Sequence, residues 1–164
     1  MNENDFWRLS AVEISRLTQA GDISAEQITQ SHVDRMARVN PQLNAVVEDL
    51  SEAALERARY LDVKRASGAE LGPLHGVPVT IKINVDQAGS PTSNGVLAFK
   101  NIIAKQDAPL VTNLLHAGAV VIGRTNTPEF SFRAETENRL YGRTHNPWGL
   151  HASPGGSSGG AGAA

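Results

Sequence analysis

The sequence predicts an α/β fold, and two observations carry this prediction. Residues 76–83 and 119–124 have the alternation and the β-branched side chains of strands, and a helical pattern closed by Gly118 lies between them. A strand, a long connection with a helix and a second strand form a βαβ unit, which makes the two strands parallel. At about 150 residues per domain, the 164 residues allow one domain or slightly more, with a buried core.

The first helix is expected over residues 10–20, where apolar residues recur on one helical face. Ser10 precedes Glu13 by three residues, the spacing of a capping box, and Gly21 is a stop signal. This helix opens a helical lead-in at about residues 8–40.

A second helix follows almost directly. Ser24 and Gln27 repeat the capping box, and Pro41 is expected to end the helix. Residues 43–50 then predict a strand, and residues 51–68, rich in Ala, Leu, Glu and Arg, predict a helix.

Composition excludes several classes of function. The formal charge of −2 gives no basic field for phosphate backbones, so nucleic acid is not expected as a direct partner. The absence of cysteine excludes disulfides and thiolate chemistry, and the histidines lack metal-ligand spacing, so no metal is expected. No apolar run approaches the roughly 18 residues of a membrane helix, and no signal peptide is visible, so a cytoplasmic location without membrane association is expected.

Lys82 is the first candidate for chemistry, because it lies in the apolar strand segment 76–83. A lysine among aliphatic neighbours loses solvation of its ammonium form, so its pKa falls and a neutral amine becomes available as a base. The alternative is an edge-strand lysine whose amine reaches solvent. Spacing alone favours that alternative.

Residues 154–160, PGGSSGG, are the second candidate. Glycine pairs permit positive φ and can turn successive N–H groups inward, which brings serine hydroxyls close to a ligand. The same composition also fits a flexible tail over residues 155–164. Composition does not decide between the two.

Taken together, four motifs resemble the amidase signature family in order and spacing. They are PLHGVPVTIK (73–82), HAGAVVIGRTNTPEF (116–130), ETEN followed by YGRTHNPW (135–148), and SPGGSSGGAGAA (153–164). The resemblance covers nearly the whole chain, including the lead-in VNPQLNAVV (39–47).

The resemblance implies a mixed β-sheet covered by helices on both faces, and a hydrolase of carboxylic amides that uses a Ser-cisSer-Lys triad and no cofactor. The matching positions here are Lys82 and Ser157, the serine of an unusual cis peptide, and Ser158 is expected to orient the lysine amine. The remaining residues of the loop that the resemblance carries over are Gly155, Gly156, Gly159 and Gly160.

In the implied mechanism, neutral Lys82 takes a proton from Ser157, which takes one from the attacking serine. The family's attacking serine belongs to a further Gly-Gly-Ser segment, which residues 1–164 do not contain. We therefore expect this chain to be the N-terminal part of one amidase domain, with an α/β part over about residues 43–164, incomplete at the C-terminus and inactive alone.

Two alternatives stay open at this point. The A subunit of a tRNA-dependent amidotransferase resembles the same motifs, and a short, non-catalytic binding or interaction protein could retain the loop. In the leading interpretation the partner is a small-molecule amide whose identity the sequence does not give. A homo-oligomer is possible, but no sequence feature indicates one.

Overall fold

The computed structural model describes residues 3–164. A 3₁₀ helix, Glu3–Arg8, precedes α1, Ala11–Ala20. Both hydrogen bonds of the predicted capping box are present: the Ser10 hydroxyl accepts from the Glu13 N–H, and the Glu13 carboxylate accepts from the Ser10 N–H. The helix ends at Gly21, which adopts φ +80°, a conformation that glycine takes without steric cost.

Helix α2, Ala25–Leu43, begins as predicted but does not end where expected. The Ser24 hydroxyl accepts from an N–H three residues later, as in a capping box. Pro41 lies inside the helix, so the predicted stop at this residue is wrong. Proline disturbs the hydrogen bond and the carbonyl of the preceding turn, but the following turn still closes because the Asn44 N–H donates to the Asn40 carbonyl at 2.7 Å.

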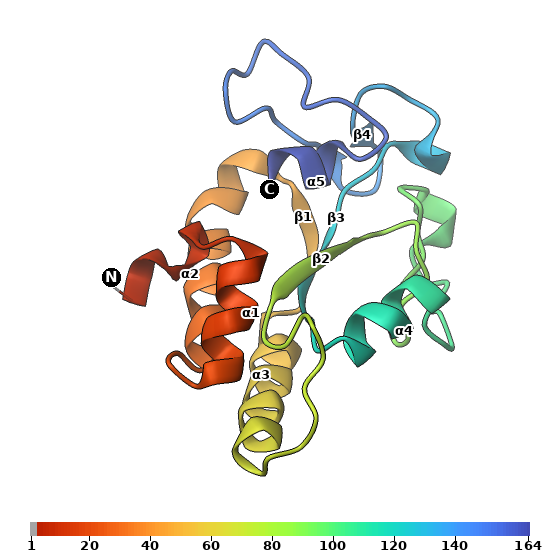
Figure 1. Cartoon of the computed structure of the whole chain (residues 1–164). Helices are drawn as coiled ribbons and strands as arrows, with labels where there is room; N and C mark the ends of the chain where they lie inside the picture. Colours follow the sequence, from red (N-terminus) through yellow and green to blue (C-terminus); the bar gives the residue numbers. More distant parts are fainter. Residues whose placement is uncertain (1–2) are drawn as a thin grey trace. The chain divides into compact units, whose positions relative to one another are not determined.

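The elements that follow agree with the predicted order of strands and helices (Figure 1). Up to the end of the βαβ unit they are β1 (Val46–Asp49), α3 (Ser51–Ala66), β2 (Pro78–Lys82), a 3₁₀ turn (Leu97–Phe99), α4 (Pro109–His116) and β3 (Val120–Thr125). After it come a 3₁₀ turn (Glu129–Ser131), β4 (Glu137–Asn138), β5 (Gly142–Arg143) and α5 (Gly159–Ala163).

The three longer strands form one sheet in the order β1-β3-β2, and β4 pairs with β5. Strands β1 and β3 are antiparallel, with Glu48 opposite Arg124. Between β2 and β3, the Val120 N–H donates to the Val77 carbonyl and the Ile83 N–H donates to the Thr125 carbonyl. The hydrogen-bonded residues follow one another in the same direction along both strands, so β2 and β3 are parallel. The predicted α/β class and mixed sheet are therefore confirmed.

The chain forms two compact units. The first unit comprises the residues up to Ala37, Leu50–Val79 and Thr112–Ile122. It contains two apolar clusters in which helices pack on strand residues. One cluster consists of Ala25, Ala54, Ala58, Leu61, Val120 and Ile122, and the other is centred on Phe6, Ile14, Ile28 and Val77.

The second unit comprises Arg38–Asp49, Thr80–Val111 and Gly123–Ala164. Many of its buried side chains are polar, among them Arg124, Asn126, Thr127, Asn138 and Thr144. No helix among residues 3–164 is long and apolar enough to cross a membrane.

Candidate active site

Lys82 is the last residue of β2 and lies in the second unit. Its neighbours Ile81 and Ile83 are buried, so the alternation of the strand turns the lysine to the opposite face. The side chain does not simply extend into solvent: Nζ donates to Ser157 Oγ at 2.8 Å and to Ser158 Oγ at 3.1 Å. Partial burial of the ammonium group lowers the pKa of Lys82 from its ordinary value of 10.5.

The two serines lie in the loop before α5. The peptide bond between Gly156 and Ser157 is cis. The loop brings both hydroxyls to the amine of Lys82, which lies 75 residues before Ser157 in the sequence. The residues that the sequence analysis selected from two distant motifs lie together.

Gly155 adopts φ +90° with open space around its Cβ position, whereas the other three glycines around the serines are explained by close packing. A Cβ atom on Gly156 would overlap the Arg133 carbonyl oxygen, and one on Gly160 would overlap the backbone of Asn126. Gly159 is buried next to Gly160, and both belong to α5. The alternative of a flexible glycine-serine tail is therefore wrong, because the segment is a packed loop and helix.

Two threonines fix the backbone of this loop. The Thr127 hydroxyl donates to the Ser157 carbonyl at 2.9 Å. Thr136 Oγ1 donates to the Gly155 carbonyl and accepts from the Gly159 N–H, each at 3.0 Å. Position in the sequence offered a weak signal for Thr127, which closely follows a predicted strand, where α/β sites often form. Thr136 lies in the ETEN motif, but the sequence analysis assigned no role to it.

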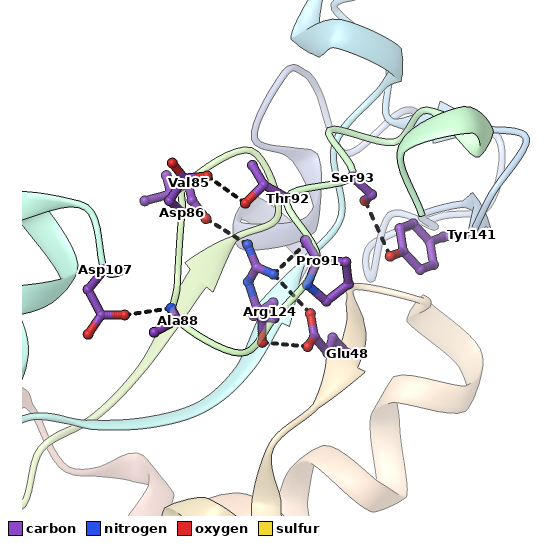
Figure 2. Close-up of polar contacts among 11 residues, drawn as sticks. Glu48, Val85, Asp86, Ala88, Pro91, Thr92, Ser93, Asp107, Arg124 and Tyr141 are labelled. Carbon is purple, nitrogen blue, oxygen red and sulfur yellow. Dashed lines mark hydrogen bonds and ion pairs between the residues drawn. The ribbon is translucent and has the colours of Figure 1, made fainter. Parts of the chain in front are cut away.

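A buried arginine anchors the segment that follows Lys82, as Figure 2 shows. Arg124 Nη1 contacts Glu48 Oε2 at 3.0 Å and donates to the Pro91 carbonyl at 2.7 Å. Its Nη2 donates to the Val85 carbonyl at 2.7 Å. Because one guanidinium binds both ends of the 85–91 segment, the chain leaving β2 is held in place on β1 and β3. Sequence reasoning missed this residue.

The arrangement can perform proton transfer between an amine and a hydroxyl. A protonated Lys82 can only donate to the two serines, whereas a neutral amine can accept the Ser157 proton while donating to Ser158. Among residues 3–164 no group of three or more His, Asp or Glu side chains could hold a metal ion.

A separate hollow of about 520 Å³ lies in the second unit and does not include the lysine or the two serines. Its lining consists of Gln42, Leu43, His145, Asn146, Pro147, Trp148, Gly149 and Leu150. The hydrogen-bonded lysine and serines, rather than this hollow, are therefore the candidate site.

Comparison with known proteins gives consistent matches along almost the whole chain. The family model described as Amidase matches residues 27–164. An indoleacetamide hydrolase of Bradyrhizobium diazoefficiens is 58% identical over 158 residues, which are 96% of this chain and 30% of that protein. The A subunit of the glutamyl-tRNA(Gln) amidotransferase of Acidothermus cellulolyticus is 41% identical over 161 residues, 98% of this chain and 32% of that protein.

Among solved structures, a bacterial aryl acylamidase of the amidase signature enzymes matches 94% of this chain and 32% of its own, with a TM-score of 0.90 and 33% identity. The chain thus spans about a third of the length of the curated relatives it matches.

Proposed function

Because the chain belongs to the amidase family, we propose that the gene product carrying it hydrolyses carboxylic amides, with Lys82 and Ser157 as catalytic residues. The observation that supports this proposal most strongly is the 2.8 Å hydrogen bond between Lys82 Nζ and Ser157 Oγ, made by a lysine whose pKa burial lowers. Together with residues 8–40, the α/β part is proposed to form the N-terminal portion of a single amidase domain.

In the proposed reaction, neutral Lys82 accepts the hydroxyl proton of Ser157, and Ser157 accepts the proton of an attacking serine. The attacking oxygen bonds to the amide carbonyl carbon, the C–N bond breaks, and the proton returns through Ser157 to the departing amine. Water then cleaves the acyl-enzyme by the same route. We assign the attacking serine to a segment of the gene product other than residues 1–164.

Ser158 has a supporting role in this scheme. Its hydroxyl lies 3.1 Å from Lys82 Nζ and accepts an N–H of the amine. A neutral amine that donates to Ser158 directs its lone pair elsewhere, which leaves it free to accept the proton of Ser157.

The indoleacetamide hydrolase relative suggests a first substrate. Its 58% identity to this chain favours indoleacetamide over other amides as the compound to test. Hydrolysis releases ammonia and the corresponding acid, so ammonia release is a direct readout.

The test compares the gene product with its Lys82→Met and Ser157→Ala variants in ammonia release from indoleacetamide. We expect each variant to lose a factor of about 10² to 10⁴ in kcat, the usual contribution of a general base. Lys100→Met is the matched control, since Lys100 is an exposed lysine of the same unit, and its kcat should stay unchanged. Retention of full activity in Lys82→Met excludes the proposed mechanism.

A second candidate function is supported by the 41% identity to a component of a glutamyl-tRNA(Gln) amidotransferase. In that case the gene product would release ammonia from glutamine and co-purify with partner subunits. Glutaminase activity in a stable complex, without hydrolysis of indoleacetamide, favours this candidate. Hydrolysis of indoleacetamide by the isolated protein favours the first.

A further inference from the structure

Ser157 is held at two points by the side chains of Lys82 in β2 and of Thr127, which follows β3. Its hydroxyl contacts Lys82 at the end of β2, and its carbonyl accepts from the hydroxyl of Thr127, two residues beyond the end of β3. The first contact belongs to the proposed proton path. The second contact fixes the peptide unit that carries the serine, and therefore sets where the Ser157 hydroxyl can point.

Thr127 is built as a rigid support. The residue is fully buried. Its N–H donates to Asn126 Oδ1 at 3.0 Å, and its carbonyl accepts from Asn138 Nδ2 at 2.8 Å. With both backbone groups bonded and no exposed surface, the threonine has little freedom, so the position of its hydroxyl is transmitted to Ser157.

A third hydroxyl completes the arrangement. Ser131 Oγ lies 3.0 Å from Thr127 Oγ1 and 2.9 Å from Asn94 Oδ1. A hydroxyl has one proton. The proton of Ser131 is donated to Asn94 Oδ1 and that of Thr127 to the Ser157 carbonyl. Asn94 thus fixes Ser131 beside the threonine, and the Thr127 proton stays on the Ser157 carbonyl.

The backbone at Ser131 has an uncommon conformation. Phe130 and Ser131 adopt φ of +54° and +60°, and neither is a glycine. Left-handed conformations are uncommon for such residues and are maintained only where surrounding contacts require them. Here the Phe130 N–H donates to the Asn94 carbonyl, which holds the turn that places Ser131 beside Thr127.

We propose that Thr127 is a positioning residue for Ser157. The inference rests on the proposed function, because it assigns Ser157 to the proton path. It adds that proton transfer through Ser157 depends on the Thr127 hydroxyl, which binds the Ser157 carbonyl and takes no part in the transfer itself.

The experiment measures kcat and KM of the gene product on indoleacetamide for three proteins: wild type, Thr127→Val and Thr127→Ser. Valine keeps the shape of threonine without the hydroxyl, and serine keeps the hydroxyl without the methyl group. We expect Thr127→Val to lower kcat about tenfold, the effect of one lost hydrogen bond in a positioned group. KM should stay within about twofold, since substrate binding is not altered.

The matched variants separate positioning from packing. Thr127→Ser should retain kcat within about threefold. Equal losses in Thr127→Val and Thr127→Ser, or a wild-type kcat in Thr127→Val, would overturn the inference. If Thr127→Val does not fold, Thr127→Ala removes the same hydroxyl without apolar bulk and is judged by the same criteria.

Two controls distinguish failure of this inference from failure of the proposed function. If Lys82→Met is inactive while Thr127→Val has the wild-type kcat, only the inference fails. If Lys82→Met is fully active, or no amide is hydrolysed, both fail. Hydrogen exchange of residues 153–160 gives a readout without substrate, and we expect faster exchange in Thr127→Val than in Thr127→Ser.

Discussion

The two compact units of this chain are stabilised by different interactions. In the first unit, both apolar clusters found among residues 3–164 join helices to strand residues, with Leu61 and Ile28 almost completely buried. In the second unit, an arginine, two asparagines and several threonines occupy buried positions and bind backbone carbonyl and N–H groups of loops. Apolar packing is tolerant of small shifts, whereas directed hydrogen bonds fix loops in one geometry. The candidate site lies in the unit with the polar interior.

The largest expected effect in this comparison is the loss of the buried guanidinium. Arg124→Met leaves Glu48 without its ion-pair partner and removes the donors to the Val85 and Pro91 carbonyls. Breaking a buried pair in this way costs about 3–5 kcal/mol. Denaturant unfolding of the gene product measures the loss, and hydrogen exchange should show its effect first in residues 85–91.

A surface pair provides the control for that experiment. Arg143 and Glu135 form an ion pair at 3.2 Å in the same unit, but both side chains are substantially exposed. Arg143→Met should lower the free energy of unfolding by no more than about 1 kcal/mol. Equal losses in the two variants would show that the buried arginine has no special structural role.

Some of this comparison could be predicted from the sequence. Local spacing predicts the helix starts at Ser10 and Ser24, and it predicts the strand that contains Lys82. All three are present. The predicted stop at Pro41 was wrong because one missing N–H does not end a helix whose next turn can still close.

The supports of the site could not be predicted in the same way. Arg124 binds groups 33, 39 and 76 residues away in the sequence, and Thr127 binds a carbonyl 30 residues away. The spacing of apolar and polar residues within one helix or strand does not predict hydrogen-bond partners at such sequence separations. The glycines of the 155–160 loop were ambiguous because composition cannot distinguish a flexible segment from one in which neighbouring backbone excludes a Cβ atom.

The next largest effect is expected in the first unit, which contains the apolar clusters. Ile28→Ala removes a fully buried side chain from the cluster that includes Ile14 and Val77, and should cost about 2–5 kcal/mol through lost burial and a residual cavity. Hydrogen exchange should accelerate in α1 and α2. Val12→Ala, on the exposed face of α1, should be neutral within about 0.5 kcal/mol. A smaller loss for Ile28→Ala than for Val12→Ala would contradict the assigned core.

The smallest expected effect concerns the cap of α1. Ser10→Ala removes the hydroxyl that accepts from the Glu13 N–H and should lower the free energy of unfolding by about 1 kcal/mol. Ser10→Thr keeps an accepting hydroxyl and should retain most of that stability. A loss that is the same for alanine and threonine would mean that the hydroxyl does not cap the helix.

The central claim, that Lys82 supplies a neutral amine to Ser157, is tested most directly by titrating that amine. Trace labelling of the gene product with acetic anhydride over a range of pH, followed by mass spectrometry of the peptide containing Lys82, reports the fraction of neutral amine. Because burial lowers the pKa of Lys82, labelling should reach half of its maximum below pH 10.5, and the low-pH limb of kcat should follow the same curve. A labelling midpoint at or above 10.5, or a kcat that does not follow the labelling curve, would contradict the account.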